Sequence, residues 1–507
     1  MVFKNAWTIG LGTFSSRVLG FIRDVLIGAY LGTSDSAQAF FVAFKLPNLL
    51  RDIAAEGAAS SSFIPVLAQY KTKNESEYIE LVSALYSVMT SILLGISITG
   101  MLMAPILVSI IAPGFLQNPQ LFHTTTILAR TLFPFIFFIG IFAVNMSLLH
   151  TEGKFSTTAM GQPLFNASMI CALLLFGRTG PLSAASIGVW AGGIALISMQ
   201  TISILNLPFK VKITRPRMHP GIFQMFKLFL PRIFGTVIYH INILVDTILA
   251  SLASIVGQGG IAAIYYANRL MQFPLALFST SIAQAALPHL SLKHAEEIDA
   301  GLLSKDIQKA ITTSAFFILP SAVFLGMCRK LVISVIFKRG AFDDYAVSIT
   351  SSVLLFYAAG LVAFAGIKIL VSIFYSMQDT KTPVKTATIS LIVNTLLNVI
   401  LMFPMKIAGL ALASAIAGTV NMLLLAFHLN KRVRFLSKGL LSPLSKITGA
   451  SVIMAILLMF SKISQSPPSI IILAKAIAIS GAGYLLGCGI FKCRILEYII
   501  RRGSERL

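Results

Sequence analysis

The chain has 507 residues, of which 56% are hydrophobic and only 11% are charged, and its mean hydropathy is +0.85. Soluble globular domains carry about 25% charged residues, so this composition excludes a soluble enzyme and indicates a polytopic membrane protein. The formal charge of +22 would suit a nucleic-acid partner, but the basic residues lie in short segments between apolar runs. Because no basic domain is formed, we expect no nucleic-acid partner and interpret most of this charge as a signal of membrane topology.

Apolar runs long enough to cross a bilayer follow one another along the whole chain. A spanning helix needs about 20 mainly apolar residues, so the sequence predicts an all-α protein with about 14 transmembrane helices. The predicted spans are 6–30, 37–69, 79–112, 121–150, 156–177, 183–206, 221–250, 261–290, 306–337, 344–376, 383–403, 408–430, 442–463 and 470–491. The second is long, and we expect a break near Pro47 and Gly57.

Loop charge predicts the orientation. When the N-terminus is placed inside, the inner segments hold most of the lysine and arginine residues, as the positive-inside rule requires. We therefore expect both termini to lie in the cytoplasm. The basic tail, which contains Arg501, Arg502 and Arg506, would then contact anionic lipid headgroups or act only as a topology signal.

The second and eighth predicted helices are similar in sequence. Residues 39–46 (AFFVAFKL) match 263–270 (AIYYANRL), which aligns Lys45 with Arg269, and residues 232–235 (RIFG) resemble 17–20 (RVLG). Matching helices lie six apart, so the two halves share one orientation, as in transporters built from parallel repeats. We predict a six-helix lobe at 1–206, a second at 207–430, and two additional helices with a basic tail at 431–507.

Several basic residues lie well inside apolar helices. Arg17 lies about 16 Å into the first predicted helix, near the middle of the bilayer. A charge at that depth costs about 2.5–3.5 kcal/mol on insertion scales and needs a partner, a hydrated cavity or a ligand. Arg17 and Asp24 share a helix face and are expected to form one ion pair, but nearby acids are fewer than the cations. The candidate substrate-binding residues are Arg17, Arg23, Lys45, Arg51, Arg269 and Lys368.

This cation set indicates an anionic ligand between the two lobes. Arginine binds phosphate oxygens with two parallel hydrogen bonds and lysine adds a point charge, so a diphosphate fits the set. The alternative is that individual cations are structural and paired with acids or backbone carbonyls.

Asp246 is the acid of the seventh predicted helix, and Asn394 and Asn398 lie one turn apart on the eleventh. Their oxygens are a candidate site for a coupling ion, with Na⁺ bound there or a proton on Asp246. Pairing of Asp246 with a cavity arginine is the alternative. We expect no other metal and no cofactor, because the four cysteines and seven histidines are scattered.

Enzyme motifs are missing from the sequence. It contains no GxxxxGK[ST], no HExxH and no clustered aspartate motif, and the predicted outer loops are too short for a catalytic domain. We expect a transporter.

Four stretches together resemble the MurJ (MviN) family of lipid II flippases. They are residues 16–24 (SRVLGFIRD), 39–58 (from AFFVAFKLPNLLR to AEGA), 265–270 (YYANRL) and 374–383 (FYSMQDTKTP). The resemblance extends from about residue 6 to residue 430. The chain departs from the family pattern at Gln38, Asn268 and Gln272, where acids are often found, and these changes make the cavity more positive.

The resemblance implies the fold of the multidrug/oligosaccharidyl-lipid/polysaccharide exporter superfamily. It implies a substrate, lipid II, that is carried from the inner to the outer leaflet of the bacterial cytoplasmic membrane for peptidoglycan synthesis. It also implies that the arginines matching the family motifs, Arg17, Arg23, Arg51 and Arg269, line the cavity, and that helices 442–491 form a groove for the lipid tail. Proteins of cell-wall synthesis or division are further candidate partners. The alternatives are an exporter of another polyprenyl-diphosphate-linked oligosaccharide, a drug exporter and a non-transporting scaffold.

Overall fold

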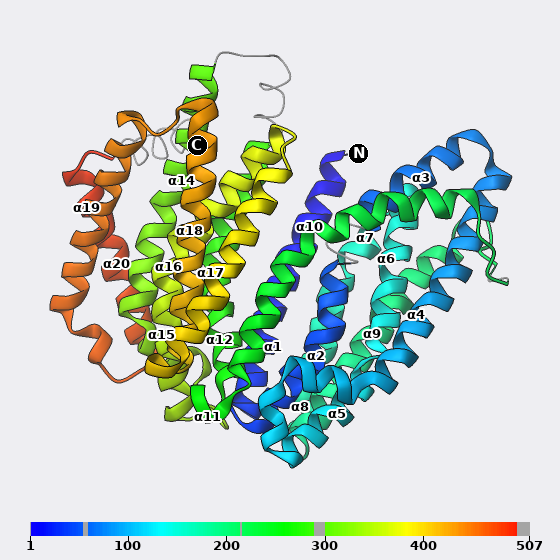
Figure 1. The fold of residues 1–507 in the computed structure, drawn as a ribbon, viewed down its shortest axis with the longest axis horizontal. Helices are drawn as coiled ribbons and strands as arrows, with labels where there is room; N and C mark the ends of the chain where they lie inside the picture. The colour runs from blue at the N-terminus through cyan, green and yellow to red at the C-terminus, as the bar shows by residue number, and fades with distance from the viewer. Residues whose placement is uncertain (1, 54–58, 213–214, 288–299, 494–507) are drawn as a thin grey trace. The chain divides into compact units, whose positions relative to one another are not determined.

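The computed structural model describes residues 2–53, 59–212, 215–287 and 300–493, and for residues 2–9, 46, 50–53, 59–61, 231–239, 300 and 464 it describes the backbone alone. Within these ranges every regular element is a helix, which confirms the all-α prediction (Figure 1). The chain divides into two compact units. Unit 1 comprises residues 1–254 and 339–342, and unit 2 comprises residues 255–338 and 343–507.

Unit 1 contains the helices from α1 to α10. Their bounds are α1 Val2–Leu31, α2 Asp35–Ile53, α3 Ala59–Lys73, α4 Glu75–Ile111, the 3₁₀ helix Pro113–Gln117, α5 Pro119–Leu132, α6 Phe135–Thr151, α7 Ser156–Ala159, α8 Gly161–Phe176, α9 Pro181–Leu205 and α10 Pro220–Ala250. The short helix α11 (Ala253–Val256) lies at the boundary between the units.

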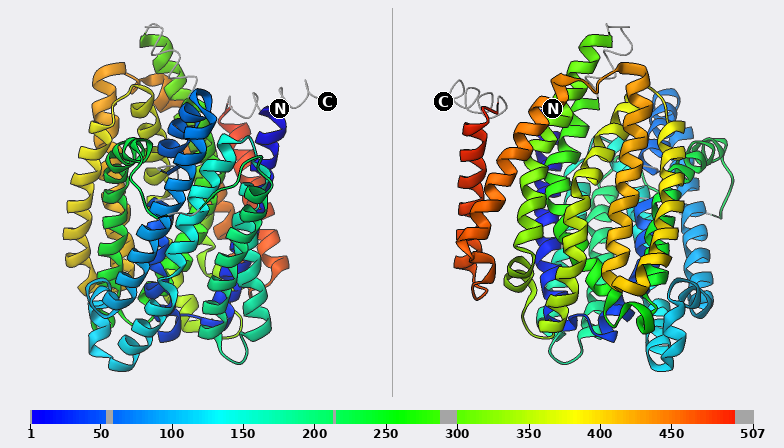
Figure 2. Two further views of the ribbon diagram at one scale, coloured as in Figure 1. Left: turned by 90° about the vertical axis from the view of Figure 1, so that its right-hand side faces the viewer. Right: turned by 60° about the vertical axis from the view of Figure 1, so that its left-hand side comes forward.

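Unit 2 contains the remaining helices. Their bounds are α12 Gly260–Pro274, a π-helical turn Leu275–Thr280, α14 Ala300–Met327, α15 Arg329–Phe337, α16 Asp344–Ser376, α17 Lys381–Met405, α18 Ile407–Val433, α19 Lys438–Ser461, a 3₁₀ turn Ile463–Gln465 and α20 Ile470–Ile490. Helices α19 and α20 lie side by side (Figures 1 and 2). They pack closely, because a Cβ at Gly483 would lie 2.8 Å from the Leu457 Cδ1 and a Cβ at Gly487 would lie 2.7 Å from the Ala450 Cα.

Eleven helices in the described part of the chain are long and apolar enough to span a membrane. The predicted count of fourteen is therefore not confirmed. The three further predicted spans, 6–30, 37–69 and 221–250, are helical as α1, α2 with α3, and α10. The predicted break near Gly57 falls in 54–58, outside the described residues, whereas Pro47 lies inside α2.

Small residues allow close helix packing in each unit. In unit 1 a Cβ at Gly188 would lie 2.9 Å from the Met169 Cα, and in unit 2 a Cβ at Gly360 would lie 2.9 Å from the Ala415 Cβ. Close backbone approach of this kind is how membrane helices associate where lipid offers no hydrophobic driving force. Many large apolar side chains are instead exposed on the protein surface, among them Leu102, Leu175 and Leu205.

The same turn occurs after the fourth predicted span of each sequence half. The Lys154 N–H donates to the Leu149 carbonyl at 2.8 Å, and the Asp379 N–H donates to the Phe374 carbonyl at 2.9 Å. The preceding residue has a positive φ in both turns, +72° at Gly153 and +56° at Gln378.

Each of these turns is tied to the end of the sixth span of its own half. Lys154 Nζ donates to the carbonyls of Ser203 and Asn206, and Asp379 accepts from Arg432. This correspondence supports the predicted repeat. The boundaries 1–206, 207–430 and 431–507 stay predictions, because compactness groups α10 with unit 1 and does not measure sequence repetition.

Candidate functional site

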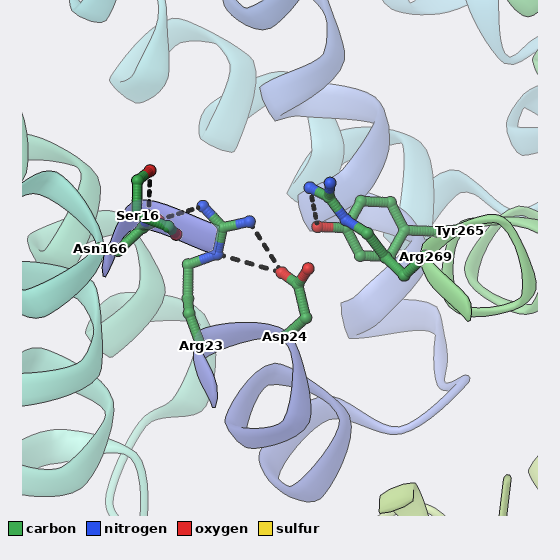
Figure 3. Close-up of polar contacts among 6 residues, drawn as sticks. All are labelled: Ser16, Arg23, Asp24, Asn166, Tyr265 and Arg269. Atoms are coloured by element: carbon green, nitrogen blue, oxygen red, sulfur yellow. Dashed lines mark hydrogen bonds and ion pairs between the residues drawn. The ribbon is translucent and has the colours of Figure 1, made fainter. Parts of the chain in front are cut away.

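Arg23 of α1 lies at the centre of a buried polar cluster in unit 1 (Figure 3). Its Nε and Nη2 atoms donate to Asp24 Oδ1 at 3.0 and 2.8 Å, and its Nη1 donates to Asn166 Oδ1 at 2.8 Å. The Nδ2 of Asn166, on α8, donates to the Ser16 carbonyl at 3.0 Å. Arg23 and Asp24 are 7% and 2% exposed, so the arginine that the sequence placed inside the membrane is buried and neutralised by its neighbour.

The expected pairing of Arg17 with Asp24 is not what the structure shows. Asp24 forms its ion pair with Arg23, whose guanidinium reaches the same carboxylate oxygen with two nitrogens, whereas the Arg17 side chain is exposed. Breaking a buried ion pair typically costs about 3–5 kcal/mol, because the remaining charge is left buried. An anion that binds Arg23 would therefore compete with Asp24 for the guanidinium.

Lys45 of α2 contacts α10. Its ammonium donates a hydrogen bond to the Thr247 hydroxyl, and the negative charge of Asp246 acts on it electrostatically. Thr247 in turn donates to the Ile243 carbonyl within α10 at 2.7 Å, which fixes the direction of its hydroxyl. The cation of α2 and the acid of α10, singled out separately in the sequence, thus act on one another in unit 1.

Arg269 of α12 has an exposed side chain in unit 2. Its Nη2 donates to the Tyr265 hydroxyl at 3.1 Å, and its guanidinium carbon lies 5.1 Å from the centroid of the same ring. Five residues after Arg269, Pro274, which has no N–H, leads into the π-helical turn, a rare geometry that is frequent at functional sites. Arg269 is thus held by tyrosine one turn away and remains accessible to an anion.

The two remaining predicted binding residues are Lys368 and Arg51. Lys368, on α16, is exposed. The Arg51 side chain lies outside the described residues. Beside Arg269, the Asn268 Oδ1 is buried without a hydrogen-bond partner in the described part of the chain.

The residues of the candidate coupling-ion site belong to both units: Asn394 and Asn398 lie in unit 2 and Asp246 lies in unit 1. In unit 2, Asn398 Nδ2 donates to Asn394 Oδ1 at 2.9 Å, and Asn394 Nδ2 donates to the Ser414 hydroxyl at 3.2 Å. Among the described residues no group of three or more His, Cys, Asp or Glu side chains could hold a metal ion.

Sequence reasoning missed Asn166, Thr247 and Tyr265. Asn166 is 5% exposed within an otherwise apolar helix, which is a detectable signal, since a buried amide needs partners. Tyr265 lies four residues before Arg269, on the same helix face, so that contact follows from helical spacing. Thr247 carries no signal in the sequence.

Apolar spanning helices that carry buried or half-buried cations define a polytopic membrane transporter. The chain belongs to the MurJ family of lipid II flippases, because the sequence profile described as "Lipid II flippase MurJ" matches residues 27–478.

Similar proteins come from several bacteria. The chain is 34% identical to a protein named "Probable lipid II flippase MurJ" from Buchnera aphidicola subsp. Acyrthosiphon pisum, over 85% of this chain and 84% of that protein. It is 32% identical to the "Lipid II flippase MurJ" of Burkholderia cenocepacia, over 90% and 89% of the two chains.

Solved structures with the same fold include a member of this family. A structure titled "Lipid II flippase MurJ, inward closed conformation" superimposes with a TM-score of 0.81 at 26% identity and covers 96% of this chain and 99% of that chain. An inward-facing MATE family transporter of the MOP superfamily shares the fold, with a TM-score of 0.68 at 14% identity over 83% of this chain and 94% of that one.

Proposed function

We propose that this chain carries lipid II, the undecaprenyl-diphosphate-linked muropeptide, from the inner to the outer leaflet of a bacterial cytoplasmic membrane. The observation that carries the proposal is the presence of cationic side chains inside otherwise apolar helices of a member of this family. Arg17 and Lys368 are exposed, Arg269 is accessible beside Tyr265, and Lys45 is held by Thr247.

The diphosphate is the part of lipid II that these cations recognise. The guanidinium fork of arginine matches two oxygens of one phosphate, and such charge-assisted hydrogen bonds are roughly twice as strong as neutral ones. At Arg23 the diphosphate would exchange with Asp24, whose carboxylate already occupies the fork. Arg51 is assigned to the same site from its place in the family motif.

Transport then follows from alternating access. The head group enters from the cytoplasmic side, and the cations close around it in one state more tightly than in the other. Only this difference in affinity shifts the equilibrium between the states. A membrane potential that is negative inside favours outward movement of an anion by about 2.3 kcal/mol per charge per 100 mV.

Asp246, Asn394 and Asn398 form the proposed coupling-ion site, which would bind Na⁺ or a proton. The amide oxygens of Asn394 and Asn398 are hard ligands of the kind that alkali ions accept, and Asp246 supplies negative charge that also acts on Lys45. Replacement of Asp246 by asparagine should abolish any dependence of transport on the Na⁺ or proton gradient. Unchanged dependence in Asp246→Asn would reject the assignment.

The last two helices, 442–491, are proposed to hold the lipid tail. Exposed apolar residues of α19 and α20, such as Phe460 and Ile470, offer the hydrocarbon surface that such a chain needs. With both termini in the cytoplasm, the basic residues 431, 432, 434 and 438 would meet anionic headgroups of the inner leaflet.

Complementation tests the function directly. A bacterium depleted of its own lipid II flippase would receive the wild-type chain, Arg269→Ala or Arg269→Lys at matched membrane levels, and lipid II on the outer leaflet would be assayed. We expect wild type to restore exposure and growth, Arg269→Ala to fail, and Arg269→Lys to retain part of the activity. Failure of the correctly inserted wild-type chain would instead favour another polyprenyl-diphosphate-linked oligosaccharide as the substrate.

A further inference from the structure

Three polar side chains of unit 1, Tyr86 of α4, Asn145 of α6 and Gln200 of α9, are buried away from the sites described above. They are 7%, 1% and 0% exposed, respectively. The Tyr86 hydroxyl donates to Asn145 Oδ1 at 2.5 Å. Among the residues that the structure describes, Asn145 Nδ2 and both polar atoms of the Gln200 side chain have no hydrogen-bond partner. We call these three residues the polar layer.

The packing of α6 on α9 places Gln200 at the level of Asn145. A Cβ at Gly193 would lie 3.0 Å from the Phe138 ring, so these two residues lie at one level. Asn145 and Gln200 each follow seven residues later, about two turns further along the same side of their helices. The helices stay together beyond this level, because the Lys154 ammonium donates to carbonyls at the end of α9. The two carboxamides therefore lie at one level of the contact between α6 and α9.

Apolar clusters enclose the polar layer on both sides, and each of the three helices contributes to both clusters. One cluster includes Leu93, Ile141 and Ile197, and the other includes Val82, Leu148 and Ile204. On α6 and α9 the polar residue lies three or four residues from a member of each cluster, and therefore on the same helix face. The polar atoms are thus sealed between apolar side chains, where leaving them unpaired is costly.

The hydrogen-bonding groups of the polar layer select its ligand. Asn145 Nδ2 offers only donors, whereas the Gln200 side chain offers two donors and a carbonyl acceptor. A cation would bind the Gln200 oxygen but leave the N–H groups of both amides unpaired, and an anion would leave that oxygen unpaired. Water both donates and accepts, and a buried water typically makes about three hydrogen bonds. Water is therefore the ligand that fits the polar layer.

We propose that unit 1 binds a water molecule between Asn145 Nδ2 and the Gln200 side chain, and that this water ties α6 to α9. Gln200 is then a positioning residue, because it acts through the water on Asn145 and so on Tyr86 of α4. A buried polar contact of this kind holds packed helices in one register where apolar packing alone would allow several. The inference goes beyond the proposed function and does not rest on it, since it concerns the inside of one unit.

Radiolytic labelling of the purified full-length protein tests for the water. A short X-ray pulse converts bound water into hydroxyl radicals, which oxidise neighbouring aromatic side chains, and mass spectrometry measures the modified fraction at Tyr86. Tyr266 in unit 2, which is 0% exposed, is the buried reference. We expect Tyr86 to be modified severalfold more than Tyr266 in the wild type. Gln200→Met keeps the length of the side chain but removes both polar atoms, and should lower labelling of Tyr86 to that of the reference.

Ser198→Ala, which removes an exposed hydroxyl of α9, is the control and should leave the labelling of Tyr86 unchanged. Equal labelling of Tyr86 and Tyr266 in the folded wild type would overturn the proposal, as would wild-type labelling of Tyr86 in Gln200→Met. The measurement needs no lipid II, so its failure and a failure of the proposed function are distinguishable.

A double-mutant cycle tests whether the water joins α6 to α9. Asn145→Leu and Gln200→Leu each remove one side of the bridge and should each lower the melting temperature by several degrees. Because the water is no longer held once one side is lost, the double variant should lose clearly less than the sum of the two shifts. Asn145→Leu combined with Ser198→Ala is the control pair and should be additive.

Additive shifts in Asn145→Leu/Gln200→Leu would reject the tie between the helices. A direct hydrogen bond between the two amides would also give non-additive shifts, but it would leave Tyr86 labelled no more than Tyr266, which contradicts the bound water. Where a leucine variant fails to fold, Asn145→Ala and Gln200→Met complete the same cycle.

Discussion

Arg23 of α1 and Asn166 of α8 are joined by a hydrogen bond of 2.8 Å, although they are 143 residues apart in the sequence. Asn166 simultaneously donates to the Ser16 carbonyl, so one amide ties two turns of α1 to α8. Asn166 is therefore a positioning residue: it holds the guanidinium of Arg23 in place without having to touch the substrate.

Replacing Asn166 by alanine should weaken the site and the fold together. A buried donor of Arg23 would lose its acceptor, which costs about 1–3 kcal/mol. We expect a lower melting temperature and reduced lipid II exposure in Asn166→Ala. Ser198→Ala, which removes an exposed intrahelical hydroxyl of α9, is the control and should leave both unchanged. Equal melting temperatures for the two variants would argue against the contact.

Asp24→Asn should destabilise more strongly. The change leaves the Arg23 cation buried without its counter-charge, at a cost of about 3–5 kcal/mol. The double variant Asp24→Asn/Arg23→Gln should recover most of the stability but not the transport. Unfolding measured for both single variants and the double variant gives the coupling energy, and additive effects would contradict a direct ion pair.

Thr247→Val tests the contact between α2 and α10. Valine keeps the shape of threonine but cannot accept a hydrogen bond from Lys45, so we expect a loss of about 1 kcal/mol in unfolding free energy. Thr247→Ser keeps the hydroxyl and should lie close to wild type. If valine and serine have the same effect, the hydroxyl does not hold Lys45.

Asp379, in the turn between α16 and α17, is expected to make the stability of the fold depend on pH. Partial burial of Asp379 raises its pKa, but hydrogen bonds from Thr382 and Arg432 outweigh this effect and lower the pKa to about 2. Because the folded-state pKa lies below the ordinary value, the carboxylate stabilises the fold at neutral pH, and this contribution disappears as pH falls toward 2. Asp379→Asn should therefore cost about 1 kcal/mol at pH 7, as for loss of a helix cap, and progressively less in acid.

Unfolding of wild type and Asp379→Asn measured between pH 7 and pH 3 checks this prediction. Asp344→Asn removes an exposed surface pair with Lys338 and is the control, with an expected effect of about 0–1 kcal/mol. A gap between wild type and Asp379→Asn that stays constant with pH would show that the ionised carboxylate contributes nothing.

Much of the fold was predictable, because long apolar runs in water-free surroundings have few alternatives to helices. The predicted span 344–376 begins and ends with α16, and 470–491 extends one residue past α20. The intramembrane cations could also be predicted, because a basic residue within a long apolar segment is unusual. The pairing partners were not, because Asp24 has several arginines within reach and the choice of Arg23 depends on side-chain geometry.

Equilibrium binding of lipid II to the purified protein tests the central claim, that cationic side chains recognise the diphosphate. The comparison would include wild type, Arg269→Lys and Arg269→Ala, each with undecaprenyl diphosphate and with the neutral undecaprenol. We predict that Arg269→Ala weakens diphosphate binding about tenfold or more, equivalent to about 1.4 kcal/mol, and that added salt weakens wild-type binding. Undecaprenol binding should not respond to either change. Equal affinity of wild type and Arg269→Ala for undecaprenyl diphosphate would contradict the account.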